Sequence, residues 1–330
     1  MKHNALSVTS LFFLLALSMT ACIGATSSSV PVTESHPPTN TPVPSATPAP
    51  TEVPPPPCLI AFDSDRDGNR EIYVMGPDGS NLLNLTNHPA EDWSPVWSPD
   101  GSRIAFVSDR VKDNGSIQCI FVMNADGSEA RILVNDYYND HPDWSPDGLV
   151  ITYTSGDDIF ITSTDGKGQP INLTDSPEKD AYPVWSPDGS QIAWLSSDGG
   201  SWQIFVMNAD GTGKRQLTDS GQVNGVSWTP DGRLFTVWQN NVADCFNCLI
   251  DPESTSITDA GGKGDLALYF PFWNADGQMV EVVSANFLTG DEEICLVGEM
   301  YPDYFFNLTN NPAQDLHPNW PAKCGPASNK

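Results

Sequence analysis

The chain has 330 residues, of which 42 are Asp or Glu and only 15 are Lys or Arg, so its formal net charge is −27 at pH 7. Binding to nucleic acid or to an anionic lipid surface requires clustered cations, and the sequence has no such cluster. The composition therefore argues against both as direct partners. The length exceeds one ordinary domain, although a repeat fold can use it in a single ring.

The first residues of the chain indicate export. Lys2 precedes an apolar run from Leu11 to Leu17, which is too short to span a membrane. The junction Ala21-Cys22 resembles the bacterial lipobox, in which the Cys becomes the lipidated first residue, although Met19 stands where that motif usually has Leu. We predict a lipoprotein signal peptide over 1–21 and a lipid anchor on Cys22. The alternative is an ordinary secretory signal in which Cys22 is incidental.

A proline-rich segment follows over residues 22–57. Eleven Pro lie between Pro31 and Pro57, interleaved with Thr, Ser and Ala. Because Pro fixes φ and lacks an N–H, this composition cannot build a core and favours an extended, polyproline-like stalk. At about 3.1 Å per residue its reach is up to roughly 100 Å. The sequence therefore predicts a domain displayed at a distance from a membrane.

A tryptophan followed by a Pro-Asp-Gly turn recurs along the rest of the chain. The segment from Val96 to Gly101 is the clearest copy, and an apolar run from Ile104 to Val107 follows it. Pro sets φ for the turn and Gly supplies its special dihedral angles, so each unit predicts a strand, a tight turn and a strand. The intervals are 47, 41, 43, 45 and 47 residues, and the last two copies are degraded: Trp97, Trp144, Trp185, Trp228, Trp273 and Trp320.

This period predicts an all-β fold, a six-bladed β-propeller of four-stranded blades over residues 58–324, with a tail at 325–330. Residues 58–86 lack the innermost, Trp-bearing strand, whereas Asp315 to Trp320 supplies such a strand at the very end. We therefore expect the C-terminal strand to complete the first blade and close the ring. The segment from Cys245 to Cys248 falls where a turn between the second and third strands of its blade is expected.

The repeat resembles that of TolB-type, WD-repeat-like propellers. The resemblance covers residues 58–324 and is carried by Leu-Thr, Pro-x-Trp-Ser-Pro-Asp-Gly, Ile-Ala-Phe-x-Ser-Asp-Arg and Ile-Phe-Val-Met-Asn-Ala-Asp-Gly. It implies the propeller fold, which proteins of many functions share. TolB proteins also carry an N-terminal α/β domain that serves the Tol assembly. A Pro-rich stalk occupies that place here, so the Tol role is not carried over.

Two cysteines flank the predicted closure of the ring. Aligning the last Trp repeat on the first places Cys324 and Cys58 at neighbouring positions where the chain ends join. Because an exported protein meets an oxidising environment, we predict a disulfide between them. A closed loop of that length would stabilise the fold by about 5 kcal/mol in the chain-entropy model. Cys245 and Cys248 are a second candidate pair.

Histidines and acidic residues gather in the loops that lead into the inner strands. These loops vary between repeats, whereas each Asp of the Pro-Asp-Gly turns on the opposite face caps its own turn. We predict that the variable face is the working surface, with the residues His88, His141, His317, Asp92, Asp140, Asp180, Asp315 and Tyr182. Imidazole beside carboxylate also suits a transition metal held by the three histidines. A metal site, a metal-free binding mouth and a merely solvated rim all remain open.

These features predict a surface-tethered, non-catalytic binding or scaffold lipoprotein, periplasmic or at the cell surface, that touches the membrane only through its lipid. The sequence has no Gly-x-Ser-x-Gly elbow and too few residues for an α/β-hydrolase domain beside the propeller. We expect a monomer without a cofactor that binds a protein, peptide or glycan, with a cationic or metal-bridged partner favoured by the acidic loop face. The alternative is a metal-dependent enzyme resembling polysaccharide lyases that hold a metal through His residues at the propeller mouth.

Overall fold

The computed structural model describes residues 58–111, 118–135, 138–197, 199–242, 245–260, 268–273, 279–284, 292–297 and 305–321. The predicted signal peptide, Cys22, the stalk and the tail lie outside these residues. Cys324 also lies outside them, so its disulfide with Cys58 stays a prediction. All the described strands belong to one compact unit, Glu52–Lys330. No helix in this part of the chain is long and apolar enough to cross a membrane.

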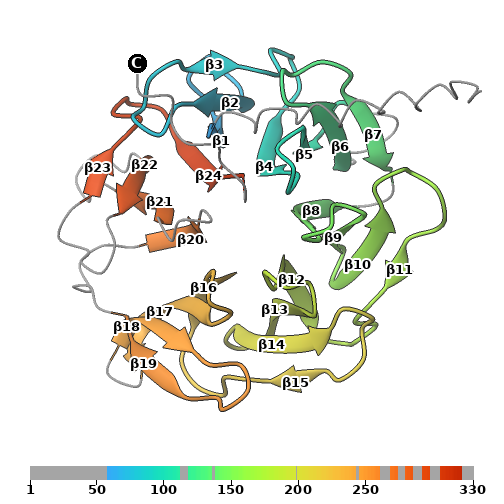
Figure 1. Ribbon diagram of the computed structural model, residues 1–330, viewed down its shortest axis with the longest axis vertical. Coiled ribbons are helices and arrows are strands. Elements are labelled where there is room, and N and C mark those ends of the chain that lie inside the picture. Colours follow the sequence, from blue (N-terminus) through green and yellow to red (C-terminus); the bar gives the residue numbers. More distant parts are fainter. Residues whose placement is uncertain are drawn as a thin grey trace, which may run out of the picture. The chain divides into compact units, whose positions relative to one another are not determined.

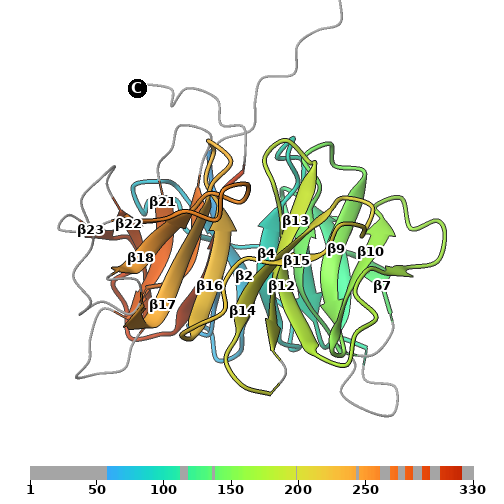
Figure 2. The ribbon, with the colours of Figure 1, turned by 90° about the horizontal axis from the view of Figure 1, so that it is seen from below.

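Antiparallel four-stranded sheets surround a central axis, and the first strand of each repeat lies nearest to that axis (Figure 1). Seen from the side, the strands run between the two faces of the ring (Figure 2). The described strands form six such sheets, which we call blades 1 to 6. From the axis outwards, blade 1 consists of β24 (Asp315–Asn319), β1 (Ile60–Ser64), β2 (Glu71–Met75) and β3 (Leu83–Asn84), and blade 2 of β4 (Asp92–Trp97), β5 (Arg103–Ser108), β6 (Cys119–Asn124) and β7 (Arg131–Val134). Blade 3 consists of β8 (Asn139–Trp144), β9 (Val150–Ser155), β10 (Asp158–Ser163) and β11 (Ile171–Asn172), and blade 4 of β12 (Lys179–Trp185), β13 (Gln191–Ser197), β14 (Gln203–Asn208) and β15 (Arg215–Gln216). Blade 5 consists of β16 (Val223–Trp228), β17 (Leu234–Val242), β18 (Cys245–Ile250) and β19 (Ile257–Asp259), and blade 6 of β20 (Leu268–Trp273), β21 (Met279–Ser284), β22 (Glu292–Val297) and β23 (Phe305–Asn307).

The two ends of the propeller meet in blade 1. Strand β24 pairs antiparallel with β1, with Asn319 opposite Ala61 and Asp315 opposite Ser64. The expectation that the C-terminal strand completes the first blade is confirmed. This pairing joins segments from opposite ends of the described chain, so the ring is closed by backbone hydrogen bonds.

The segment from Cys245 to Cys248 was expected in a turn, and this was wrong. It begins β18 and pairs with β17, with Cys248 opposite Thr236. The second strand of blade 5 is nine residues long. The hairpin is therefore longer than in the regular repeats, and the cysteine segment lies within its ladder.

The Pro-Asp-Gly turns have the role expected from their chemistry. In the first copy the Gly101 N–H donates to the Ser98 carbonyl at 2.8 Å, and Gly101 has φ +66°. Oδ1 of Asp100 accepts from the Ser102 N–H at 3.0 Å and from the Ser98 hydroxyl at 2.6 Å. The same Asp-capped arrangement recurs at Asp147 and Asp188. These carboxylates therefore stabilise their own turns.

The repeat tryptophans fasten each blade to the one before it. Trp97 belongs to a buried cluster with Ala61 and Ile72 of blade 1. The indole N–H of Trp144 donates to the carbonyl of Val96 in blade 2 at 3.1 Å, and Trp228 bonds blade 4 in the same way. Trp144 and Trp228 thus pack between two sheets and satisfy their indole donors there. The indole nitrogens of Trp97, Trp185, Trp273 and Trp320 are buried without a hydrogen-bond partner among the described residues.

At two blade junctions, the residue before the repeat Trp forms a hydrogen bond between adjacent blades. Oδ1 of Asn319 accepts the backbone N–H of Trp97 at 2.8 Å, and Oδ2 of Asp143 accepts that of Trp185 at 2.7 Å. Desolvation raises the pKa of Asp143 to about 7. The two junctions therefore share a geometry, but only the one at Asp143 responds to pH.

Candidate functional site

The inner strands of all six blades have a register shift, and in four of them the residue three positions before the repeat Trp has a positive φ. The strand registers shift at this point, and Ser94, His141, Tyr182 and His317 adopt φ angles of 51°, 50°, 58° and 49°. A left-handed backbone at a residue other than Gly costs roughly 1–3 kcal/mol. The same strained conformation at one repeat position, on strands next to the axis, marks these residues as candidates for function.

These bulges surround a small cavity at the axis. Its lining residues come from five inner strands and are mostly Pro, Val and the bulge residues themselves: Ser94, Pro95, Val96, His141, Pro142, Asp143, Tyr182, Pro183, Val184, Gly225, Val226 and His317. The cavity has a volume of about 70 Å³. Because one water occupies about 30 Å³ in the liquid, this space accepts a couple of waters or the end of one side chain.

A buried carboxylate holds His317. Its Nδ1 lies 2.7 Å from Oδ1 of Asp63, which is fully buried in β1. Burial acts to lower the pKa of His317, but the Asp63 carboxylate, with a smaller contribution from Asp140, outweighs it and raises the pKa above its usual value. Asp63 also accepts the backbone N–H of Ser94 at 3.1 Å. His317 is therefore a fixed imidazole that keeps its proton to higher pH than an ordinary histidine.

His141 lies near His317, but its pKa is shifted in the opposite direction. Its ring centroid lies 6.4 Å from that of His317 and 4.0 Å from that of Tyr182. Burial lowers the pKa of His141 against the attraction of Asp140, and the charge on His317 lowers it further. The side chains of His141 and His317 are 21% and 17% exposed. Two imidazoles whose pKa values are shifted in opposite directions therefore stand together where solvent still reaches them.

Asp140 supplies the exposed carboxylate of this group. Its side chain is 29% exposed. Oδ1 accepts from the indole N–H of Trp93 at 3.2 Å, from the Ser94 hydroxyl at 3.3 Å and from the His141 N–H at 2.8 Å. Among the described residues Oδ2 accepts no hydrogen bond, so half of this carboxylate remains available to a ligand. We call His141, Tyr182, His317 and Asp140 the channel mouth.

Three other acidic residues of the predicted surface are buried inside their blades. Asp92 is fully buried and 2.6 Å from Arg110 of its own blade. Asp315 is equally buried and 2.7 Å from Arg66. Asp180 is 3% exposed and accepts hydrogen bonds within blade 4. Each is the residue of the inner strand that pairs with the end of the second strand, and this register places its side chain inside the blade.

The structure separates His88 from the other two histidines. Its Nδ1 accepts the N–H of Ala90 at 3.0 Å, and its own N–H donates to Glu71 at 2.7 Å. His88 therefore shapes the loop into β4. In the parts of the chain that the structure describes, no group of three or more His, Cys, Asp and Glu is arranged to hold a metal ion.

Sequence reasoning missed Asp63 and Ser94. Asp63 interrupts an apolar strand at a position where blade 2 has Val107 and blade 4 has Leu195, and this polar exception could have found it. Ser94 stands three residues before its Trp, the same offset as His141.

Comparison with known proteins supports the fold. Residues 41–165 match the family model described as TolB beta propeller domain. The solved structure of TolB from Acinetobacter baumannii superposes with a TM-score of 0.66 at 18% identity, covering 80% of this chain and 66% of that one. Over these residues the chain is similar to the TolB propeller, and the superposition shows a shared propeller fold.

The proteins that this chain resembles in sequence differ in what their names say. A "Protein TolB homolog" of Chlorobium luteolum is 35% identical over 158 residues, 47% of this chain and 35% of the relative. The "Uncharacterized peptidase YuxL" of Bacillus subtilis is 34% identical over 112 residues, 34% of this chain and 15% of the relative. The chain thus spans about a third or less of the length of these two proteins. The likeness identifies the repeat, while the function has to come from the site.

Proposed function

We propose that this protein is a non-catalytic binding module of the cell envelope, exported, tethered by a lipid on Cys22 and engaging a protein or peptide at the channel mouth. The observation that carries the proposal is the meeting of His141, Tyr182 and His317 on strained bulges next to a cavity. Strain of this kind persists only where the surrounding structure fixes it, and it concentrates at functional sites. The apolar leader and the Pro-rich segment support the export and the tether.

The chemistry of the mouth favours a basic residue of the partner. Oδ2 of Asp140 can accept from a cation, while the His141 and Tyr182 rings, tilted 46° to each other, provide an aromatic wall beside it. The net charge of −27 attracts a basic partner over longer distances. Binding should therefore weaken as salt screens both effects.

Two observations favour binding over catalysis. The cavity of about 70 Å³ is far smaller than the roughly 300–1,000 Å³ of typical substrate pockets. His88, the third ligand in the metal-enzyme alternative, bonds its own loop at Ala90. A polysaccharide lyase-like reaction would need a larger cleft and a different placement of that histidine.

Binding is tested by capture from intact bacterial cells with the full-length protein as bait and chemical crosslinking. Variants Asp140→Asn and His141→Asn are suitable because Asn tolerates the left-handed backbone at position 141. We expect each to reduce the recovery of the partner several-fold without lowering the melting temperature. Lys167→Ala is the control, since Lys167 is 85% exposed in a turn between the third and fourth strands, on the opposite face. An equal loss in the control variant would show that the wrong face was chosen.

The tether is tested separately with labelled palmitate in a bacterial host. We expect the parent chain to take up the label and to sediment with membranes, and a Cys22→Ser variant to do neither. Label retained in that variant, or absent from the parent, would disprove lipidation at Cys22 and leave the binding proposal untouched.

A further inference from the structure

Blades 1 to 4 contain the same aromatic pair. In each, one aromatic residue of the second strand lies directly opposite one of the third strand, and the ring centroids are 5.5–5.9 Å apart. The pairs are Phe62 with Tyr73, Phe106 with Phe121, Tyr153 with Phe160, and Trp194 with Phe205. Each pair forms an apolar floor beside the start of the inner strand.

In blades 1 and 2 an arginine lies on this floor. The guanidinium carbon of Arg66 is 5.2 and 4.7 Å from the centroids of its two rings, and that of Arg110 is 5.3 and 5.4 Å from its own. Each guanidinium also bonds the buried acid of the inner strand, Asp315 at 2.7 Å and Asp92 at 2.6 Å. Aromatic floor and carboxylate together form a guanidinium site that the chain itself fills.

With one exception, each blade has either both the acid of the inner strand and the arginine that bonds it, or neither. In blades 1 and 2 a residue of the second strand pairs with the acid of the inner strand, and the arginine lies two residues after that paired residue. Blades 3, 5 and 6 lack both, because their corresponding pairs are Asn139 and Asp157, Val223 and Asn240, and Leu268 and Ala285. Blade 4 keeps the acid as Asp180, opposite Ser196, but its arginine position is Asp198, which lies outside the described residues.

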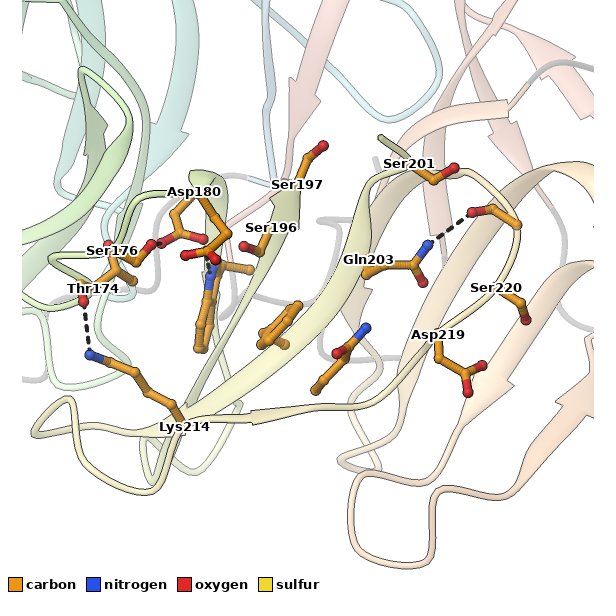
Figure 3. A pocket seen from close by; sticks show the side chains of 15 residues that line it. Thr174, Ser176, Asp180, Ser196, Ser197, Ser201, Gln203, Lys214, Asp219 and Ser220 are labelled. Atoms are coloured by element: carbon orange, nitrogen blue, oxygen red, sulfur yellow. Dashed lines mark hydrogen bonds between the residues drawn. The ribbon is translucent and has the colours of Figure 1, made fainter. Parts of the chain in front are cut away.

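The space above the floor of blade 4 is a cavity of about 580 Å³ (Figure 3). Asp180 and Ser176 lie at one end, and Gln203 and Asp219 at the other. Trp194 and Phe205 also line the cavity. Oε1 of Gln203 is buried and has no hydrogen-bond partner among the described residues. The volume lies within the range of ligand sites, about 300–1,000 Å³.

Asp180 has hydrogen bonds but no cation. Its Oδ1 accepts from the indole N–H of Trp194 at 2.9 Å and its Oδ2 from the hydroxyl of Ser176 at 2.8 Å. Neither donor is charged, and no Lys, Arg or His in the described part of the chain is within 4.0 Å of it. Lys214, which lines the cavity, donates instead to the carbonyl of Thr174 at 3.0 Å (Figure 3). A carboxylate that is 97% buried without a cation is costly unless a ligand supplies one.

We propose that the cavity of blade 4 binds a guanidinium group from outside the chain, namely an arginine side chain of a partner or a small guanidino compound. The planar cation stacks on Trp194 and Phe205 as Arg110 does on its own pair, and its N–H groups bond Asp180 and the unpartnered Oε1 of Gln203. This site is separate from the channel mouth, so it can fail or hold independently of the function proposed above.

The test is titration of the full-length protein with small probes, followed by calorimetry or by indole fluorescence. N-acetyl-arginine methylamide should bind at least tenfold more tightly than the isosteric, uncharged citrulline derivative. The lysine derivative should also bind more weakly than the arginine probe, because its ammonium group is not planar and cannot stack on the rings. Tighter binding of free L-arginine than of the blocked form would indicate a small-molecule ligand, and the reverse a chain-borne arginine. Equal affinity for the arginine and citrulline probes, or no binding of either at millimolar concentrations, would overturn the proposal.

Variants then place the site. Asp180→Asn and Phe205→Leu should each weaken the arginine probe several-fold or more, whereas Glu129→Gln, which changes an exposed acid in a turn of blade 2, should leave its affinity unchanged. Melting curves show whether each variant is folded. If Asp180→Asn does not fold, Phe205→Leu and the comparison of probes still decide. Undiminished binding in a folded Asp180→Asn variant would contradict the assignment.

Discussion

Blade 2 and blade 4 have the same strand order, the same cross-strand aromatic pair and the same buried acid at the start of the inner strand. In blade 2 the acid is neutralised by Arg110 of the same hairpin, which lies over both rings. In blade 4, among the residues that the structure describes, the acid bonds neutral donors only and lines an open cavity. The difference shows that one repeat completes its core with its own side chain, while another with the same framework leaves a cavity beside its acid.

The largest effect is expected where the internal cation is removed. Arg110→Ala leaves Asp92, which is fully buried, without its partner, so we expect a loss of about 3–5 kcal/mol in the free energy of unfolding. Urea denaturation measures it. Arg215→Ala is the control, because the Arg215 pair with Glu253 is exposed and 3.7 Å long, and it should cost less than about 1 kcal/mol. Similar losses in the two variants would refute the importance of the buried pair.

The same variant can turn blade 2 into a second open site. Without its guanidinium, the Phe106 and Phe121 floor beside Asp92 should accept ethylguanidinium from solution. We expect this probe to raise the melting temperature of Arg110→Ala more than that of the parent protein. Equal shifts would mean that the aromatic floor and the acid do not by themselves select a guanidinium.

Neutralising the buried acid should change the free energy of unfolding by different amounts in the two blades. Asp92→Asn leaves Arg110 partly buried without its counter-ion and should cost about 2–3 kcal/mol, whereas Asp180→Asn removes an uncompensated charge and should cost less than about 1 kcal/mol in ligand-free protein. Unfolding of both variants under identical conditions tests this. A larger loss in Asp180→Asn would indicate that a cation already compensates that residue.

The two blade junctions should differ in how their contribution to stability depends on pH. The pKa of Asp143 is raised from 3.8 to about 7, so the folded state favours the protonated form. The resulting stability is fully present below about pH 4 and is lost as the pH rises through about 7. Asp143→Asn copies Asn319 at the equivalent junction and should raise the free energy of unfolding by about 1–3 kcal/mol at pH 8, but hardly at pH 4. A gain that does not change with pH would contradict the cause.

The smallest expected effect concerns the bulges. His141 in blade 3 has φ +50°, a conformation that Gly adopts without steric cost. His141→Gly should therefore change stability by no more than about 0.5 kcal/mol, whereas the β-branched His141→Val should cost about 1–2 kcal/mol more because Val is strained at positive φ. Thermal unfolding of the pair decides this. Equal stabilities would show that the bulge relaxes in the variants.

The sequence by itself determined the repeat, because its signals are local. Pro and Gly fix the turn at Gly101 whatever surrounds it, alternating apolar residues define the strands on either side, and Trp97 marks where the inner strand ends. A missing first strand and a surplus last strand were enough to predict that β24 joins β1. The offset of three residues before the Trp also gave His141 and His317 as equivalent positions.

Only the tertiary structure decided which of these residues can meet a ligand. Asp92, Asp180 and Asp315 look alike in sequence, but the register of neighbouring strands buries all three, and only two of them receive an arginine. His317 meets His141 because ring closure brings the last strand beside the first blades, and Asp63 fixes its proton there. Such contacts depend on strands far apart in the chain, and local sequence patterns carry no information about the distance between them.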